Sequence, residues 1–354
     1  MQKKGVSQVV TTLIILLVVI VAVGIVAAVI YNMVSKGQEN VEELGQFNVN
    51  LEVEKVLVDD SGDTQVVIER KQGNADLTGL KFVVSDGLTT QEISYTFPEE
   101  DFLEEFDKKE IPLEGLNILV RDVAVIPLIG ASQDPAGAIE KELSKRQVYE
   151  ANGAVSYWAL DGNADDAIGS NNGQIMGGAD CSVEGRVGGA CDFDGTDDYI
   201  LISDNFDTSD LQGDFSFSAW IKADNFNNYK RIISIRSNYI DTNSFESDLA
   251  FHTANGDSLI FYATSGGYVL STAKSINEWY HVVGVKKGTS LKMYVDGKID
   301  GPTNRNSNYV GKDGRATIGR AFYAEAFFNG KIDEVAIFKK ALSADEVAAL
   351  YAIY

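Results

Sequence analysis

Residues 215–223 have the sequence FSFSAWIKA, in which large apolar side chains alternate with smaller or polar ones. Successive side chains of a β-strand point to opposite faces, so this alternation predicts a strand that buries one face in a core. Residues 291–298, LKMYVDGK, alternate in the same way and contain Asp296-Gly297, a pair typical of a two-residue hairpin turn. Both stretches therefore predict antiparallel strands of a β-sandwich.

Short strand patterns separated by turns continue on both sides of these stretches, from Val155 to the end of the chain. They include DDYILIS, KRIISIRS, SLIFYAT, WYHVVGVKKG and KIDEVAIF. Many short strands in succession are typical of a β-sandwich. Near the end, Ser343 and Glu346 match the capping box S-x-x-E, which predicts that a short helix begins there.

The order of the motifs in this part of the chain resembles that of laminin-G-like, concanavalin A-like jelly rolls. The motifs are YWALDG at 157–162, GRVGGA and FDGTDDYI within 185–200, WYHVVGV at 279–285 and NGKIDEVAIFKKALSADEV at 329–347. The resemblance implies a two-sheet jelly-roll sandwich over residues 153–354. Members of that family mostly bind glycans, proteins or calcium, and relatives elsewhere in the superfamily hydrolyse polysaccharides.

Calcium is the cofactor that this resemblance suggests. In the family, a metal commonly links the N-terminal strand to the C-terminal one, and the matching positions are Asp161 and Asp333, with Asp166 as an additional candidate. Calcium takes six to eight oxygen ligands, often from carboxylates and backbone carbonyls. Alternatively, Asp161 caps a turn and Asp333 accepts hydrogen bonds from backbone amides.

Aromatic side chains on loops are the usual platforms for sugar rings, and four candidates fall in or near predicted loops: Tyr239, Phe245, Tyr309 and Tyr323. Catalysis is not expected, since no Ser/His/Asp order, nucleophile elbow or glycosidase carboxylate pair can be assigned in this part of the chain. His281 lies within a strand motif and is expected to be a packed or edge histidine. A surface glycoside hydrolase remains a remote alternative.

The two cysteines, Cys181 and Cys191, lie in CSVEGRVGGAC. A zinc site would need a second pair of ligands, and the chain has only two histidines. The glycines between the cysteines allow the loop to fold back, so we expect a disulfide. A disulfide would indicate an oxidising compartment, consistent with export.

The start of the chain predicts its topology. Lys3 and Lys4 precede an uncharged run from Gly5 to Ser35, whose most apolar part extends from Leu13 to Tyr31. At ~1.5 Å per residue this part spans about 30 Å as a helix, the thickness of a hydrocarbon core. The two lysines favour an N-terminus on the cytoplasmic side, with the rest of the chain outside.

This arrangement resembles the class III signal peptide of archaeal type IV pilins and archaellins. The matching residues are Lys3, Lys4 and Gly5, followed by VSQVV, in which Gln8 stands where proline is common. The resemblance implies that residues 1–5 are a leader cleaved by a prepilin peptidase between Gly5 and Val6. Residues 6–45 would then form a hydrophobic transmembrane or pilin-type helix. Two outcomes stay open: incorporation into a filament of like subunits, or permanent anchoring in the membrane.

Between the helix and the jelly roll, the sequence predicts a small antiparallel β-domain at 46–130 and a polar linker at 131–152 with a possible helical turn. FNVNLEVEKVLVDD alternates from Phe47, and DLTGLKFVVSDG resembles segments of the β-domains behind archaeal pilin helices. The expected fold class is therefore mainly β, with one hydrophobic N-terminal helix and two β-units.

The composition sets the remaining expectations. Hydrophobic residues make up 45 % of the chain, which excludes general disorder. The net charge of -22 repels phosphate backbones, so nucleic acid is not an expected partner. We expect a non-catalytic, pilin-like surface protein, a minor or tip-type subunit whose jelly roll binds a cell-surface glycan or protein in adhesion. The expected location is the cytoplasmic membrane or a surface filament, with the C-terminal part extracellular.

Overall fold

The computed structural model describes residues 49–58, 63–73, 77–87, 89–98, 102–129, 134–135, 139–226, 229–237, 248–254, 257–263, 267–302, 305–306, 314–321 and 326–354. The predicted leader, with Lys3, Lys4, Gly5 and Val6, and the predicted N-terminal helix lie outside these residues. Within the described part, no helix is both long and apolar enough to cross a membrane. The chain forms two compact units, and each is considered by itself.

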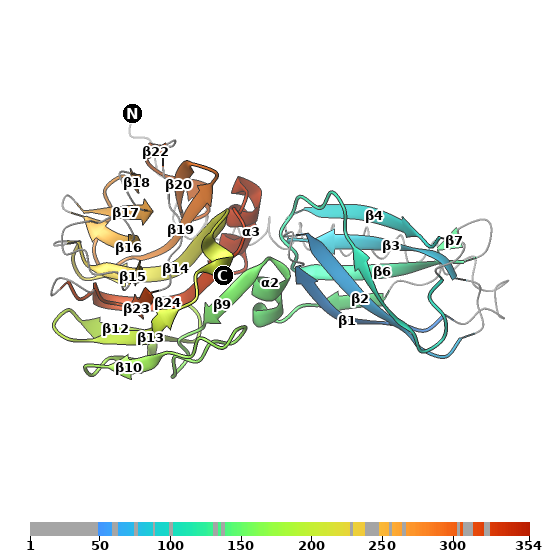
Figure 1. Cartoon of the computed structure of the whole chain (residues 1–354), viewed down its shortest axis with the longest axis horizontal. Helices are drawn as coiled ribbons and strands as arrows, with labels where there is room; N and C mark the ends of the chain where they lie inside the picture. Colours follow the sequence, from blue (N-terminus) through green and yellow to red (C-terminus); the bar gives the residue numbers. More distant parts are fainter. Residues whose placement is uncertain are drawn as a thin grey trace, which may run out of the picture. The chain divides into compact units, whose positions relative to one another are not determined.

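The first unit contains two antiparallel sheets (Figure 1). One sheet has the strand order β1-β2-β5, from β1 (Leu51–Val58), β2 (Thr64–Arg70) and β5 (Lys108–Pro112). The other has the order β4-β3-β6-β7, with β8 also pairing β6, from β3 (Leu77–Ser85), β4 (Thr90–Thr96), β6 (Asp122–Ile129), β7 (Asp134–Pro135) and β8 (Ile139–Glu142). Ile68, Phe82 and Val125 are fully buried, so alternate positions of these strands form the core. The predicted small β-domain is thus a β-structure.

The second unit is a sandwich of two antiparallel sheets (Figure 1). The first sheet has the order β10-β13-β23-β15-β16-β17-β18. Its strands are β10 (Gln174–Met176), β13 (Tyr199–Phe206), β15 (Arg231–Ser237), β16 (Asp248–Ala254), β17 (Ser258–Ala263), β18 (Tyr268–Leu270) and β23 (Gly314–Ile318).

The second sheet has the order β11-β12-β24-β14-β19-β20-β21, with β9 also pairing β24 and β22 pairing β20. Its strands are β9 (Ala154–Trp158), β11 (Asp180–Glu184), β12 (Gly189–Asp194), β14 (Phe215–Ala223), β19 (Trp279–Lys287), β20 (Ser290–Val295), β21 (Lys298–Ile299), β22 (Arg305–Asn306) and β24 (Asn329–Phe338). A 3-10 turn, η1 (Ser209–Leu211), precedes β14, and two helices, α2 (Lys145–Ala151) and α3 (Ala344–Ala352), complete the unit. The second unit is therefore a jelly-roll-like sandwich of two antiparallel sheets, as the sequence predicted.

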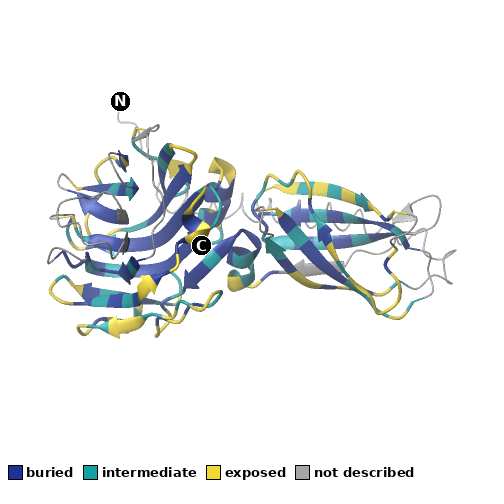
Figure 2. Cartoon of the chain, viewed as in Figure 1, coloured by how far each residue is buried: buried dark blue, intermediate teal, exposed yellow. Residues whose placement is uncertain are grey.

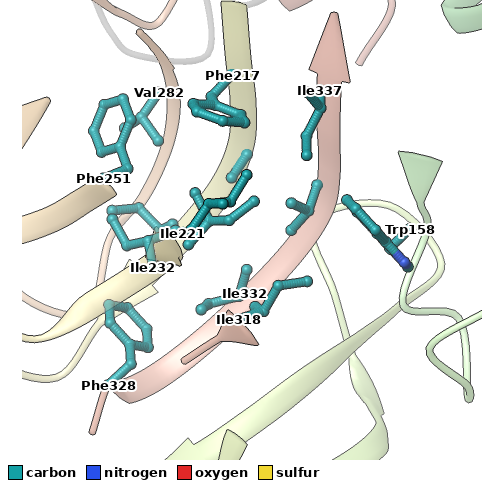
Figure 3. Packing of buried hydrophobic residues seen from close by; sticks show 14 of the residues in the cluster. Trp158, Phe217, Ile221, Ile232, Phe251, Val282, Ile318, Phe328, Ile332 and Ile337 are labelled. Atoms are coloured by element: carbon teal, nitrogen blue, oxygen red, sulfur yellow. The ribbon is translucent and has the colours of Figure 1, made fainter. Parts of the chain in front are cut away.

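The core lies between these two sheets (Figures 2 and 3). Phe217 and Ile221 from β14 face Ile232 and Phe251 from the other sheet, and all four side chains are almost completely buried. Gly284 of β19 has no room for a side chain, because a Cβ there would lie 2.5 Å from the Phe261 ring of β17. The sandwich is therefore packed tightly enough for one position to require glycine.

The prediction that 215–223 buries only one face is wrong. Every residue of β14 except Lys222 is buried. The outward-facing Trp220 stacks on Tyr351 of α3 at a ring distance of 5.6 Å, and the Ser216 hydroxyl donates to the Lys340 carbonyl. The C-terminal segment thus covers the outer face of the sheet, so β14 is buried on both sides.

Part of the predicted linker is regular structure. Residues 139–142 form β8, which pairs with β6, and residues 145–151 form α2. Ser144 caps α2, since its hydroxyl accepts from the Gln147 amide while the Gln147 side chain accepts from the Ser144 amide. Within the second unit, the Asn152 side chain bonds both the N–H and the C=O of Val120, and this fixes the end of α2.

Two local predictions are confirmed. Ser343 and Glu346 form the expected capping box at the start of α3. Asp296 and Gly297 connect β20 to β21 with φ values of 50° and 75°, the positive values that a type I′ hairpin turn requires. The sequence therefore specified these two connections locally, through residue types suited to their backbone angles.

Candidate acidic site on the β12–β13 loop

The loop of residues 194–198, called the acidic loop below, leads from β12 in one sheet to β13 in the other and carries three carboxylates. Asp194, Asp197 and Asp198 each offer an oxygen within 4.8 Å of the others, and they form the one such group of three found among the described residues. Asp194 and Asp197 are exposed, whereas Asp198 is 6 % exposed. Grouped carboxylate oxygens of this kind can serve as ligands for a hard cation.

Local hydrogen bonds stabilise the conformation of the acidic loop. The Asp194 carboxylate accepts from the Thr196 amide at 2.7 Å, and the Asp198 carboxylate accepts from the Asp194 amide at 2.9 Å. Gly195 between them has a φ of 78°, and Gly177 packs so closely that a Cβ there would clash with the Asp197 backbone. The carboxylates are thus presented on a backbone with little freedom to move.

The three carboxylates differ in acidity. The hydrogen bond from the Thr196 amide lowers the pKa of Asp194 below its usual value. Burial raises the pKa of Asp198, and the charges of Asp194 and Asp197 add to that rise. A bound cation would relieve the charge repulsion among the carboxylates of the acidic loop.

Lys230 and Asn329 lie next to the acidic loop. The Lys230 ammonium donates a 2.9 Å hydrogen bond to the Phe327 carbonyl, and the Asn329 amide donates to the Asp194 carbonyl at 3.3 Å. Burial lowers the pKa of Lys230, while the Asp194 charge acts in the opposite direction. Beyond Phe327, the Arg320 guanidinium lies over the Tyr199 ring at 4.6 Å. The acidic loop therefore lies at an end of the sandwich where polar and aromatic side chains meet.

The predicted ligands Asp161 and Asp333 both contact the loop 185–189. The Asp161 carboxylate accepts from the Gly189 amide at 2.5 Å, and one oxygen of Asp333 accepts from the Arg186 and Val187 amides at 2.8 and 3.1 Å. These contacts match the alternative reading, in which Asp333 bonds backbone amides. The other Asp333 oxygen, Oδ1, is buried and has no hydrogen-bond partner among the residues that the structure describes. Burial and the neighbouring Glu334 charge raise the pKa of Asp333 to about 7.

Asp166 has a different environment. Its carboxylate accepts from the backbone amides of Tyr157, Ile168 and Gly169 through Oδ1, at 3.0, 3.1 and 2.9 Å, and from Asn171 through Oδ2 at 3.2 Å. These bonds fix the loop that follows β9. Within the described residues, Asp161, Asp166 and Asp333 do not form a metal-ligand group like the three carboxylates of the acidic loop. Calcium at Asp161 and Asp333 stays a prediction.

Other predicted positions have mixed outcomes. The disulfide between Cys181 and Cys191 is present and joins β11 to β12. His281 is completely buried, with Nε2 at 2.9 Å from the Ser218 hydroxyl, so the expectation of a packed histidine is confirmed. The four predicted sugar platforms, Tyr239, Phe245, Tyr309 and Tyr323, lie outside the described residues.

Sequence reasoning missed the Asp194, Asp197 and Asp198 group as a metal candidate. The signal was present, since all three lie in FDGTDDYI. Acidic residues in a turn usually serve the turn itself, so their spacing alone does not reveal that three carboxylates converge. The convergence depends on the path of the loop between the two sheets, where Gly177 lies too close to the Asp197 backbone to carry a side chain.

The second unit is a jelly-roll-like β-sandwich with an acidic loop at one end. Residues 194–348 match the model of the concanavalin A-like lectin/glucanases superfamily, so this span is a concanavalin A-like domain. The match begins at Asp194, the first carboxylate of the acidic loop. A comparison with curated protein sequences finds no match.

Several solved structures are similar to this chain. Domain 4 of AbnA, a GH43 extracellular arabinanase from Geobacillus stearothermophilus, is 16% identical with a TM-score of 0.42, and the match covers 56% of this chain and 98% of that one. The binding domain of Paraclostridial Mosquitocidal Protein 1 is 15% identical (TM-score 0.45; 57% and 52% covered), and Trypanosoma rangeli sialidase is 10% identical (TM-score 0.43; 84% and 52% covered). The match thus spans about half of the last two chains, 52% of each.

Proposed function

We propose that the jelly-roll unit is a non-catalytic glycan-binding module of a cell-surface protein, with calcium as its cofactor. The observation that carries the proposal is the match of residues 194–348 to a lectin-type superfamily model. A fold alone does not fix a function, so the site must supply the chemistry. The carboxylates of the acidic loop supply oxygen ligands for calcium, and an ion held there would bridge to sugar hydroxyls.

The placement of the histidines argues against acid–base catalysis by an imidazole. His281 is 0% and His252 6% exposed, and these are the two histidines of the chain. Burial lowers the pKa of each to about 3, so both are neutral and enclosed at physiological pH. A general acid or base must reach the substrate, and neither imidazole is positioned to do so.

The location rests on the sequence. Lys3, Lys4 and Gly5 before the apolar run support a processed, pilin-like anchor that puts the jelly roll outside the cell, and the disulfide is compatible with that compartment. On this basis the partners are the membrane, prepilin peptidase, like subunits of a surface filament, and a glycan or protein on a neighbouring cell surface. A permanently anchored protein that does not polymerise is the second arrangement.

Binding of the detergent-solubilised full chain to a glycan array, in calcium and again in EDTA, tests the function. We expect calcium-dependent binding to a subset of glycans and no release of sugar from the bound polysaccharides. Absence of binding in both buffers, or steady hydrolysis of a polysaccharide, would overturn the proposal. Mass spectrometry of the native N-terminus tests the processing step, since a chain beginning at Met1 is incompatible with prepilin cleavage.

A further inference from the structure

The outer face of the second sheet carries a row of three polar residues. Trp220 of β14 points to this face, where Tyr351 of α3 covers it. Trp220 pairs in register with His281 of β19 and with Asp333 of β24. Directly opposite residues of antiparallel strands point to the same face of the sheet, so Asp333, Trp220 and His281 lie side by side. These three residues are called the polar row hereafter.

Neighbouring side chains close the polar row off from solvent. No residue of the row is more than 2% exposed. The Tyr351 ring stacks against both Trp220 and His281, at ring distances of 5.6 and 6.1 Å. The Tyr354 ring meets Trp220 edge-on at 5.9 Å, and the Arg186 guanidinium lies over the same ring at 4.7 Å. A group bound to the row is therefore enclosed by protein.

Each residue of the polar row has one buried polar atom without a hydrogen-bond partner in the described part of the chain. These atoms are Trp220 Nε1, His281 Nδ1 and Asp333 Oδ1. The other polar atoms of the same side chains are bonded. His281 Nε2 lies 2.9 Å from the Ser218 hydroxyl, and Asp333 Oδ2 accepts from two backbone amides of the loop 185–189. The imidazole and the carboxylate are thus held in place, and each leaves one atom to be satisfied.

The chemistry of the three atoms limits what can bind them. Buried polar atoms of native proteins are nearly always bonded to protein or to ordered water. An indole N–H only donates, and an ionised carboxylate oxygen only accepts. A metal ion cannot accept a hydrogen bond, so it cannot serve the indole. Water both donates and accepts, so it matches all three atoms whichever imidazole tautomer is present, and it is small enough for an enclosed layer.

We propose that ordered water is enclosed between the polar row and the C-terminal segment, residues 339–354, and that it bonds the indole N–H, the imidazole Nδ1 and the carboxylate Oδ1. Ser216 on the same face needs no water, because its hydroxyl donates to the Lys340 carbonyl and accepts from the Leu342 amide. Water thus takes the positions where the segment offers no partner. This side of the sheet is a hydrated layer, whereas the other side packs apolar side chains against the opposite sheet (Figure 3).

The test is NMR spectroscopy of the detergent-solubilised full chain, labelled with isotope-enriched tryptophan. The chain has three tryptophans, and Trp158→Phe, Trp220→Phe and Trp279→Phe assign their indole signals. In a rotating-frame Overhauser spectrum, the sign of the cross-peak distinguishes an indole proton beside a long-lived water from one that exchanges with solvent. Trp158 is the matched control, since it is completely buried and its Nε1 donates a 2.8 Å hydrogen bond to the Asn171 carbonyl.

We expect a cross-peak between the Trp220 indole proton and water, with the sign of a long-lived neighbour, and none for Trp158. Hydroxyl protons exchange with water and can imitate this signal. The cross-peak should therefore persist in three variants that each remove one nearby hydroxyl: Ser218→Ala, Tyr351→Phe and Tyr354→Phe. Absence of the Trp220 cross-peak, or its loss in any of these variants, would overturn the inference.

A crystal structure of the full chain, grown in EDTA and again in calcium, checks all three atoms at once. We expect water within about 3.2 Å of Trp220 Nε1, His281 Nδ1 and Asp333 Oδ1 in both structures. A protein atom bonded to any of the three would overturn the proposal for that atom. A metal ion at about 2.3–2.6 Å from Asp333 Oδ1 in calcium would overturn it for the carboxylate.

Discussion

The Glu334 carboxylate accepts a 2.6 Å hydrogen bond from the hydroxyl of Tyr157, a residue 177 positions earlier in the chain. The same carboxylate oxygen accepts from Tyr354 at 2.6 Å, and the other oxygen pairs with the Lys145 ammonium at 2.5 Å. Glu334 is completely buried and sits at a φ of 53° where β24 departs from regular pairing with β14. One irregular residue thereby ties α2, β9 and the C-terminal residue to the sheet.

Tyr157→Phe should lower the free energy of unfolding by about 1.5–3 kcal/mol, the usual contribution of a hydrogen bond to a charged partner. The ring stays, so its stacking on Tyr149 at 4.2 Å is retained and the loss reports the hydroxyl. Urea denaturation of the full chain measures the change. Tyr229→Phe, on a side chain that is 50% exposed, is the control and should shift stability by less than about 0.5 kcal/mol. Equal shifts in the two variants would show that the Glu334 contact contributes nothing specific.

His252 predicts a pH dependence of stability. Burial and the nearby Arg231 charge hold its pKa at about 3, below the ordinary 6.5. Between these two values the unfolded chain binds a proton that the folded chain excludes, so stability falls as pH falls from about 6.5 towards 3. His281, with a pKa of about 3, acts in the same direction.

The variant His252→Asn isolates this effect, because an asparagine amide can still donate to the Thr253 carbonyl. Wild type should lose about 1.4 kcal/mol per pH unit more than the variant between pH 6 and pH 5. Urea denaturation at closely spaced pH values measures the difference. Parallel stability profiles for wild type and variant would mean that His252 is protonated in the folded state.

Gly284 predicts a cost of overpacking. Replacing it by alanine places a Cβ against the Phe261 ring of the opposite sheet, where no space exists. Gly284→Ala should destabilise the fold by about 1–3 kcal/mol. Gly213→Ala is the matched control, since a Cβ there meets nothing within 4 Å in the described part of the chain, and it should change stability by less than about 0.5 kcal/mol. A neutral Gly284→Ala would indicate that the two sheets can move apart without cost.

Calcium should stabilise the folded chain. At a calcium concentration 100 times the dissociation constant, binding adds about 2.7 kcal/mol, or roughly 5–10 °C in the unfolding temperature. Differential scanning calorimetry with calcium and with EDTA measures the shift, and Asp197→Asn should abolish it if the ion lies on the acidic loop. Asp161→Asn should abolish it instead if the ion lies between Asp161 and Asp333.

Asp180→Asn, on an exposed aspartate outside both groups, is the control and should retain the shift. An unfolding temperature that is the same in calcium and in EDTA would count against a calcium site at either position.

The sequence by itself determined the local features of the jelly roll. The alternation in FSFSAWIKA and LKMYVDGK predicted strands, Asp296-Gly297 predicted a turn and Ser343 predicted the start of α3, because each depends on a few adjacent residues. The order of motifs also predicted the sandwich, and the match of residues 194–348 to the superfamily model confirms that prediction.

Only the tertiary structure decided what the faces and turns do. Trp220 is buried on the outer side because Tyr351, 131 positions later, covers it, and three aspartates converge in the loop that carries the chain from one sheet to the other. The exposed Tyr229, with a φ of 52°, is held by Arg231 and by contacts of Lys230 with Thr253. Such relationships join residues far apart in the chain, and local periodicity carries no information about which distant partner will arrive.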